Sequence, residues 1–231
     1  MGVSKGSDKV GAIVVAAGQS QRMNGTDKIM AQLGGKPVLA WSIEALQKCK
    51  KVDRIVLVNS RRNKEPVECL VVDNKYTKVA DVCTGGERRQ DSVAAGLKLL
   101  GECEWVIIHD GARPLLTQDL IERGLKAARE TGAAVAAVPV TDTIKLAGDN
   151  QIVIETPPRH NLWAVQTPQI FRFALIKKAY QQARADVTDD AMLVEQTGGK
   201  VKLYMGSYDN LKITAPCDLA IAELLLKEHE K

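Results

Sequence analysis

Short runs of apolar, mostly β-branched residues alternate along the chain with stretches in which apolar residues recur every three or four positions. Continuous apolar runs are typical of strands in a parallel sheet that is covered on both faces, and the wider spacing predicts helices. The predicted strands cover residues 11–17, 54–60, 78–83, 105–110 and 133–140, and the predicted helices cover 37–49, 90–101 and 117–132. This order predicts the α/β class, with a doubly wound, mostly parallel sheet that binds its ligands at the carboxyl ends of the strands.

Residues 141–163 interrupt this alternation. TIKLA (143–147) and QIVIET (151–156) flank a GDN turn, which predicts an inserted β-hairpin. The hairpin is either a surface excursion or an arm that embraces a second subunit, and we expect the arm and therefore a homodimer. The rest of the pattern predicts helices over 173–186, 190–199 and 217–231, with a last strand over 202–207.

Length and composition narrow the class of protein. The chain has 231 residues, so we expect a single domain over 1–231. Its net charge of +4 is spread along the chain, which argues against a nucleic-acid partner. No window has the roughly 18 uninterrupted apolar residues of a membrane helix, and residues 1–9 are too polar for a secretory signal. Five cysteines without CxxC spacing indicate free thiols in a reducing cytoplasm rather than a zinc site.

The first predicted strand runs into AIVVAAGQSQRMNGTDKIM (12–30), which has the composition of a phosphate-binding loop. Gly18 permits unusual backbone dihedrals, and Ala16, Ala17 and Ser20 are small enough to let a phosphate approach backbone N–H groups. Arg22 offers a planar fork of donors and Lys28 a compact point charge, which suits a polyphosphate whose charge grows during reaction. Neither the GxxxxGKS/T nor the GxGxxG pattern is present. A flexible surface loop is the alternative interpretation of this stretch.

Two later stretches carry further candidate residues. GGERRQDSV (85–93) predicts a helix that begins near Gln90 or Asp91, whose free N–H groups favour an anionic or carbonyl-bearing ligand. In HDGARP (109–114), Asp110 ends a buried strand, where it interacts either with a metal-bound triphosphate or substrate hydroxyls, or internally with Arg113. We interpret His109 as a packed strand-end residue, and the three scattered histidines do not support a metal cluster.

Several motifs together resemble those of a known family. AAGxSxRM followed by a lysine is similar to the signature loop of nucleotidyltransferases that attach NMP units to sugar phosphates, polyol phosphates and molybdopterin. The chain also contains GGERRQDSVAAGL (85–97), HDGARP (109–114), PVTDTIK (139–145), RHNLW with VQTPQ (159–169), VTDDA (187–191) and DNLKIT (209–214). With these motifs the chain resembles the 2-C-methyl-D-erythritol 4-phosphate cytidylyltransferase family from about residue 11 to residue 225. The resemblance implies a Rossmann-like nucleotidyltransferase fold and the CTP-dependent step of the non-mevalonate isoprenoid pathway.

The resemblance also implies roles for individual residues. Arg22 and Lys28 would stabilise the α-phosphate as pyrophosphate leaves, with Mg²⁺ held mainly by the CTP phosphates. The residues implied on the CTP side are Ala16, Ala17, Gly18, Gly85, Gly86, Arg89, Ser92 and Asp110. Those implied on the acceptor side are Asp110, Arg113, Thr143, Arg159, Thr167, Thr188, Asp189 and Lys212. Thr143 and Arg159 would reach across a dimer interface, where Arg159 holds the acceptor phosphate, and Lys212 would help to orient that phosphate.

Three alternatives stay open on the sequence. Ribitol 5-phosphate cytidylyltransferases share most of the CTP motifs, so the acceptor depends on residues 139–169 and 187–191. A molybdopterin nucleotidyltransferase would share the opening loop but gives no reason for HDGARP or RHNLW. A nucleotide-sensing module would bind CTP without reaction. Asp27 is a departure from the family pattern, because a carboxylate beside Lys28 could compete with phosphate for its charge.

Overall fold

The computed structural model describes residues 9–18, 27–183 and 186–229, and it contains a seven-stranded sheet in the order β11-β7-β10-β6-β1-β4-β5. These strands are β1 (Val10–Ala16), β4 (Arg54–Asn59), β5 (Val79–Thr84), β6 (Trp105–Asp110), β7 (Ala133–Pro139), β10 (Trp163–Arg172) and β11 (Lys202–Met205). All neighbours pair in parallel except β10, which is antiparallel to both β6 and β7. The mostly parallel α/β sheet predicted from the apolar runs is therefore confirmed.

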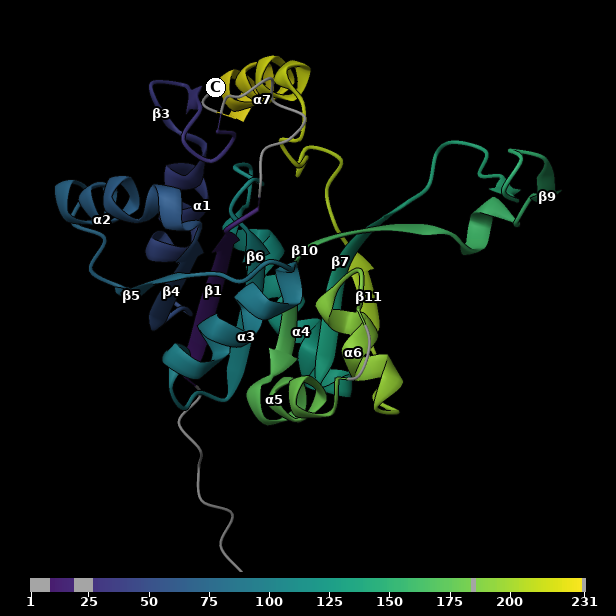
Figure 1. Cartoon of the computed structure of the whole chain (residues 1–231), viewed down its shortest axis with the longest axis horizontal. Coiled ribbons are helices and arrows are strands. Elements are labelled where there is room, and N and C mark those ends of the chain that lie inside the picture. The colour runs from purple at the N-terminus through teal and green to yellow at the C-terminus, as the bar shows by residue number, and fades with distance from the viewer. Residues whose placement is uncertain (1–8, 19–26, 184–185, 230–231) are drawn as a thin grey trace, which may run out of the picture.

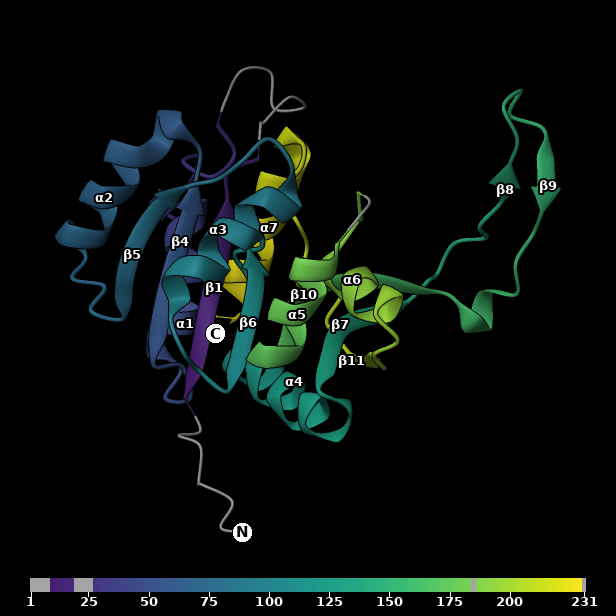
Figure 2. The same cartoon turned by 60° about the horizontal axis from the view of Figure 1, so that its bottom comes forward.

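Helices cover both faces of this sheet (Figures 1 and 2). They are α1 (Val38–Lys48), α2 (Lys64–Asp73), α3 (Arg89–Leu100), α4 (Gln118–Thr131), α5 (Phe173–Gln182), α6 (Asp190–Gln196) and α7 (Pro216–His229). Successive residues of β1 point to opposite faces, so Val14 packs in one apolar core with α1 and α4, and Ile13 in another with α3, α5 and α6. Both faces of the strand are buried, which explains its continuous apolar sequence.

A third, smaller core lies beneath α7. It contains Leu33 of the short β2–β3 ribbon (Gln32–Leu33 and Lys36–Pro37), Ile213 and Leu226. Ile213 belongs to the segment that leads from β11 to α7, and its N–H donates to the Ala112 carbonyl at 2.8 Å. This core therefore holds the 206–215 segment beside the loop that follows β6.

Among the longer elements, the sequence pattern did not predict α2 or β10. Among the residues of α2, only Val67 is buried, so the helix lacks the broad apolar stripe that reveals helices in a sequence. The buried part of β10 includes Gln166, Thr167 and Gln169, and its pairing with β7 shifts register between Val165 and Gln169. A buried strand with polar residues at its centre gives no continuous apolar run, so β10 is visible only in the folded chain.

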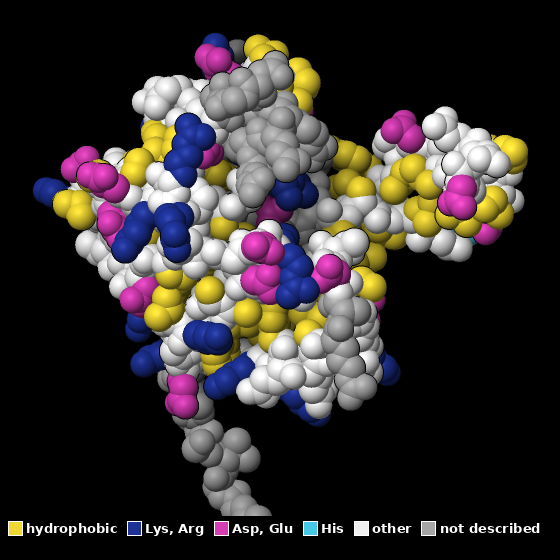
Figure 3. Space-filling view, in the orientation of Figure 1, with side chains coloured by type: hydrophobic (Ala, Val, Ile, Leu, Met, Phe, Trp, Pro, Cys, Tyr) yellow, Lys and Arg dark blue, Asp and Glu magenta, His cyan; other side chains and the backbone are white. Residues whose placement is uncertain are grey.

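Residues between β7 and β10 leave the body of the protein and form an extended arm (Figures 1 and 2). The arm carries β8 (Leu146–Ala147) and β9 (Val153–Glu155), which pair antiparallel, and a single turn η2 (Arg159–Asn161). Ile152, Val153 and Ile154 are 69%, 52% and 68% exposed. Figure 3 shows these and other apolar side chains gathered on the arm. An isolated ribbon of this length has little stability in water unless an apolar surface covers it.

In the part of the chain that the structure describes, no helix is long and apolar enough to cross a membrane.

Candidate active site

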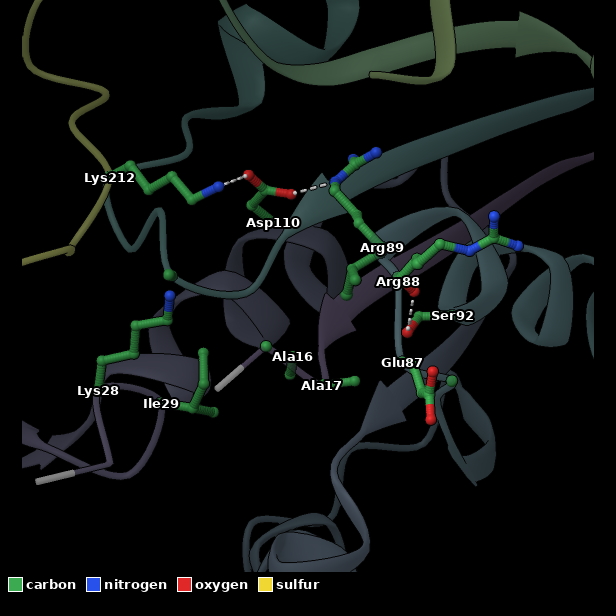
Figure 4. Close-up of a pocket in the computed structure, with 14 residues that line it drawn as sticks. Ala16, Ala17, Lys28, Ile29, Glu87, Arg88, Arg89, Ser92, Asp110 and Lys212 are labelled. Atoms are coloured by element: carbon green, nitrogen blue, oxygen red, sulfur yellow. Dashed lines mark hydrogen bonds and ion pairs between the residues drawn. The ribbon is translucent and has the colours of Figure 1, made fainter. Parts of the chain in front are cut away.

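A cavity opens at the carboxyl end of the sheet, at the point where the chain reverses its direction of winding. From β1 the chain passes to β4 and β5 on one side, whereas β6 lies on the other side of β1. In open α/β sheets this reversal leaves a crevice beyond the strand ends. The cavity is lined by Val15, Ala16, Ala17, Gly18, Lys28, Ile29, Gly86, Glu87, Arg88, Arg89, Ser92, Asp110, Ala112 and Lys212. Residues from four separate motifs of the sequence thus meet here (Figure 4).

The end of β1 and the turn before α3 approach each other closely on one side of this cavity. A Cβ atom added to Gly85 would lie 2.5 Å from the Ala17 Cβ, so no side chain fits at that position. Gly85 N–H donates to the Asn59 carbonyl at 2.8 Å, which fixes the turn against β4. Gly86 lines the cavity, and a Cβ atom there would lie 2.4 Å from the Asp91 Cβ. Gly85 therefore lets the backbone of the turn lie directly against β1, and Gly86 lets it lie against the first turn of α3.

The opening loop is described only at its two ends. Arg22 and Ser20 lie outside the described residues, and Gly18 and Lys28 mark the ends of the gap. A Cβ atom on Gly18 would lie 4.0 Å from the Lys28 Nζ, so the ammonium group is close to the end of β1. The Asp27 carboxylate accepts from Ile29 N–H at 3.0 Å and from Asn63 Nδ2 at 2.5 Å. Asp27 thus fixes the chain on either side of Lys28.

The first turn of α3 closes the cavity on its other side. Arg88 precedes the helix, and its backbone N–H donates to the Asp91 carboxylate at 3.2 Å. Its guanidinium group pairs with Asp91 at 2.7 Å and with Asp186, which belongs to the segment before α6. Ser92 is buried, and its hydroxyl donates to the Arg88 carbonyl at 3.2 Å. These bonds hold the start of the helix, whose backbone N–H groups are suited to an anionic ligand.

Asp110 lies at the centre of the site, between two cations. Its Oδ2 accepts from Lys212 Nζ at 2.7 Å and its Oδ1 from Arg89 Nε at 3.2 Å (Figure 4). Burial raises the pKa of Asp110, but the charges of Arg89 and Lys212 outweigh this effect and hold the pKa well below its ordinary value. The carboxylate is therefore ionised throughout the physiological range.

Arg113 does not form the internal pair with Asp110 that the sequence left open. Its Nη1 donates to the Asn210 carbonyl at 2.6 Å, and its Nε is buried without a hydrogen-bond partner in the described part of the chain. Only the backbones of the two residues meet, where Arg113 N–H donates to the Asp110 carbonyl at 2.9 Å. The turn after β6 directs the Arg113 side chain towards the 206–215 segment instead.

His109 is fully buried beneath the site, as expected for a packed strand-end residue. Its Nδ1 lies 3.1 Å from the Thr167 hydroxyl, which also accepts from Asp110 N–H at 3.0 Å. The Arg113 carbonyl, 3.1 Å from Nε2, can only accept, which assigns the ring proton to Nε2 and leaves Nδ1 to accept from the Thr167 hydroxyl. Burial lowers the pKa of His109 to about 4, so the imidazole is neutral and unsuited to a general base.

The expected acceptor residues do not all lie at the cavity. Asp110 and Lys212 line the cavity, and Thr167 contacts Asp110 from β10. Thr143 and Arg159 are exposed residues of the arm, and neither lines the cavity of its own chain. Arg159 Nη1 donates to the Thr141 carbonyl at 2.6 Å.

Thr188 and Asp189 stand at the start of α6. Asp189 caps the helix by accepting from Met192 N–H at 3.0 Å, and its other oxygen accepts from Gln169 Nε2 at 2.9 Å. The Thr188 hydroxyl is exposed, with the Met192 sulfur 3.9 Å away.

The sequence interpretation missed several residues of the site. Glu87 and Arg88 also line the cavity. The GGERRQDSV motif contains both residues, but nothing in the motif distinguishes side chains that face the cavity from side chains that face away. Asp190 was also missed. It is fully buried and pairs with Arg89 at 2.7 Å. The VTDDA motif contains Asp190 beside Asp189, but the motif does not show which of the two carboxylates meets Arg89.

The residues that could hold a metal are few. Among the described residues, no group of three or more His, Cys, Asp or Glu side chains could bind an ion. The acidic side chains of the cavity lining are Glu87 and Asp110. This donor set fits a cation such as Mg²⁺, which is commonly held by one or two carboxylates together with the phosphates of a substrate.

Comparisons with known proteins agree with this geometry. A family model described as 2-C-methyl-D-erythritol 4-phosphate cytidylyltransferase matches residues 10–228. A protein of that name from Dehalococcoides mccartyi is 51% identical over 222 residues, which cover 96% of this chain and 98% of the relative. The relative of the same name from Alkaliphilus oremlandii is 45% identical over 226 residues, with 95% of each chain covered.

Solved structures extend the similarity to the fold. The crystal structure of 4-diphosphocytidyl-2C-methyl-D-erythritol synthase from Anaerococcus prevotii has a TM-score of 0.84 and 31% identity, covering 95% of this chain and 99% of that chain. The structure of 2-C-methyl-D-erythritol 4-phosphate cytidylyltransferase from Thermus thermophilus has a TM-score of 0.78 and 32% identity, with the same coverage.

Proposed function

The chain belongs to the 2-C-methyl-D-erythritol 4-phosphate cytidylyltransferase family, and from that premise we propose that it joins CTP to 2-C-methyl-D-erythritol 4-phosphate. The products are 4-diphosphocytidyl-2-C-methyl-D-erythritol and pyrophosphate, in the synthesis of isoprenoid precursors. One observation carries the proposal: the end of β1, the start of α3, Asp110 and Lys212 line a single cavity, although they are far apart in the sequence.

The reaction is a transfer of the cytidylyl group between two phosphates. An oxygen of the acceptor phosphate attacks the α-phosphorus of CTP, a new P–O–P bond forms, and the bond to the departing pyrophosphate breaks. The acceptor phosphate is already an anion near neutral pH, so the attacking oxygen needs no general base. Catalysis then consists of holding the two substrates in line and stabilising the charge on the phosphates.

Lys28 and Lys212 supply positive charge on two sides of the cavity. Lys28 lies beside the end of β1, where the triphosphate would approach the backbone, and we assign it, with Arg22, to the charge on the α-phosphate as pyrophosphate leaves. Lys212 lies across the cavity beside Asp110 (Figure 4). We assign Lys212 to the acceptor phosphate, which must stand on the far side of the α-phosphorus from the leaving group.

The backbone at Ala16, Ala17 and Gly18 and the start of α3 form the proposed CTP side of the site. A bound Mg²⁺ would be held by the CTP phosphates and Asp110, and it would neutralise charge on the triphosphate. Asp110 would orient the substrates from the centre of the site, where its carboxylate stays ionised.

The arm provides the proposed contact with a second copy of the chain. Its exposed isoleucines at positions 144, 152 and 154 would be covered by that copy. Thr143 and Arg159 would then enter the partner's site, where the Arg159 guanidinium group matches the geometry of a phosphate. We place the dimer in the cytoplasm, in keeping with five cysteines that are all free.

A coupled assay of pyrophosphate release tests the reaction. Purified protein with CTP and Mg²⁺ is offered 2-C-methyl-D-erythritol 4-phosphate in one series and ribitol 5-phosphate in another. We expect turnover with the first acceptor, and product identified by mass spectrometry as its cytidine diphosphate derivative. Turnover with ribitol 5-phosphate alone would contradict the assignment, and CTP binding without pyrophosphate release would indicate a sensing module.

A subunit-mixing experiment tests the shared site. Lys28→Ala removes a group at the CTP side, and Arg159→Ala removes one from the arm. If the arm serves the partner's site, a mixed dimer contains one site with neither change. Refolding the two inactive variants together should therefore restore up to about a quarter of the wild-type activity, since half of the dimers are mixed and each has one intact site of two. Activity no higher than that of the separate variants would place Arg159 in its own chain's site.

A further inference from the structure

Four charged side chains of alternating sign run from the interior of the protein into the cavity. Asp190 of α6 pairs with Arg89 Nη1 at 2.7 Å, Arg89 Nε contacts Asp110 at 3.2 Å, and Asp110 contacts Lys212 at 2.7 Å. Figure 4 shows the last three, with Asp110 between the two cations. Asp190 is not part of the cavity lining, and its side chain is 1% exposed. This series of charged side chains thus connects the buried Asp190 to Asp110 and Lys212, which line the cavity.

Stability alone does not account for a carboxylate in this place. Asp190 is satisfied by Arg89 and by the Tyr180 hydroxyl, which donates to its Oδ1 at 2.5 Å. A buried ion pair nevertheless offsets the loss of hydration only in part, and apolar groups of similar volume often serve stability as well or better. The Arg89 guanidinium group also lowers the stability of the folded protein, because its Nη2 is buried with no hydrogen-bond partner in the described part of the chain.

The geometry of Arg89 shows what Asp190 does. An arginine that faces one carboxylate prefers to bind both of its oxygens with two parallel N–H groups. Here Asp190 holds Nη1, and Arg89 gives Asp110 only one bond, from Nε at 3.2 Å. The second oxygen of Asp110 is left to Lys212, at 2.7 Å. Burial lowers the pKa of Arg89, but the charges of Asp190 and Asp110 outweigh this effect and raise it. Arg89, which bridges the two carboxylates, is therefore charged throughout the physiological pH range.

We propose that Asp190 is a positioning residue for the cytidylyl transfer, which holds Arg89 away from Asp110 so that Asp110 and Lys212 stay arranged for the substrates. This inference rests on the proposed function for its effect on rate. Asp190 itself touches neither substrate. Without its negative charge, Arg89 turns to Asp110, competes with Lys212 for the carboxylate and displaces the ammonium group that orients the acceptor phosphate.

The first test replaces Asp190 by its uncharged isostere. Asp190→Asn should lower kcat/KM for the acceptor by about 10-fold to 100-fold, the usual effect of disturbing a group that orients the reacting parts. Asp119→Asn is the matched control, since it neutralises a 72% exposed carboxylate that pairs with Arg123, and neither residue lines the cavity. The control should stay within about twofold of the wild type. A loss smaller than twofold in folded Asp190→Asn would overturn the proposal.

A double-mutant cycle separates positioning from a general weakening of the fold. If Asp190 acts through Asp110, Asp190→Asn should reduce kcat/KM much less in an Asp110→Asn background than in the wild type. Full additivity of the two losses would refute the proposal. Arg89→Lys examines the same bridge if Asp190→Asn proves too unstable, because one ammonium group cannot span both carboxylates. It should show the same loss and the same lack of additivity.

A chemical labelling experiment tests the series from Asp190 to Lys212 without a measurement of enzyme turnover. Lys212 is exposed enough for an amine-reactive acylating reagent, and peptide mass spectrometry follows its labelling. The Lys212 amine is held against Asp110 at 2.7 Å, so loss of this pair should expose it to the reagent and make labelling several times faster in Asp190→Asn, with no change in Asp119→Asn. Equal rates in all three proteins would refute the bridge. If the wild type fails to turn over the proposed substrates, the reaction is wrong, and the labelling still decides the role of Asp190.

Discussion

His109 should make the free energy of unfolding fall as the pH is lowered from 7 towards 4. Burial lowers the pKa of His109 from 6.5 to about 4 in the folded protein. In the unfolded chain the imidazole titrates near 6.5, so between these two values the unfolded state binds more protons than the folded state. The stability that depends on neutral His109 is therefore fully present above pH 6.5 and is lost as the pH falls through this range.

The size of the effect follows from the two pKa values. Linkage predicts a loss of about 1 kcal/mol between about pH 7.5 and about pH 5.5. The loss grows to about 2 to 3 kcal/mol by about pH 4.5, and its limit at lower pH is about 3 kcal/mol. No reduction for solvent screening applies, because the ring is fully buried between Thr167 and the Arg113 carbonyl.

The test compares urea unfolding of the wild type and His109→Asn at four pH values between about 7.5 and about 4.5, followed by the fluorescence of buried Trp105. The asparagine amide oxygen can accept from the Thr167 hydroxyl but does not titrate. The variant is less stable at neutral pH, and the gap should close by the amounts given above as the pH falls. Carboxylates with a lowered pKa, such as Glu44 and Asp218, act equally in both proteins and cancel. If the free energy of unfolding had the same pH dependence in both proteins, the assignment of His109 as a buried, neutral imidazole would be refuted.

Three further predictions concern the cavity and the arm. Lys28→Ala should lower kcat by about 100-fold in steady-state assays, because its charge is needed most in the transition state, and an unchanged kcat would exclude that role. Gly85→Ala should weaken CTP binding about tenfold or more in calorimetric titrations, since its Cβ would lie 2.5 Å from the Ala17 Cβ and force the turn away from β1. Ile154→Asp should shift the protein from the proposed dimer to a monomer in sedimentation experiments, and a wild type that sediments as a monomer would contradict the proposed dimer. Val72→Asp, at a position on α2 that is 73% exposed, should leave the dimer intact.

The sequence predicted the fold where burial left a periodic signal. β1, β4 and β6 are buried on both faces, and their continuous apolar runs identified them within a residue or two. α4 has a pronounced apolar face and ends at Gly132, which adopts a positive φ of 87° that suits glycine. The pattern did not predict β10 because the buried centre of this strand is polar. Its Gln166 and Thr167 form hydrogen bonds with residues more than forty positions away in the sequence.

The sequence named several of the residues that line the cavity, but it did not reveal which side chains pair with one another. Asp189 and Asp190 are neighbours in VTDDA, yet Asp189 caps α6 while Asp190 reaches Arg89. Adjacent residues at a helix start point in directions about 100° apart, so one faces the backbone of the next turn and the other faces α3. Which of the two meets an arginine depends on how α6 packs, and that information lies in α3 and α5 rather than in the motif.

The partners of Asp110 make the same point over a longer distance. Arg113 is the nearest cation in the sequence, but the turn after β6 commits its backbone to Asp110 and directs its guanidinium group to the Asn210 carbonyl. Lys212, 102 residues away, takes the carboxylate instead, because Ile213 anchors its segment to Ala112 and to the core beneath α7. Arg89 arrives from the first turn of α3, on the other face of the sheet. Lys212 and Arg89 are thus placed by different parts of the fold, and a substitution in the core beneath α7 should move Lys212 without touching Arg89.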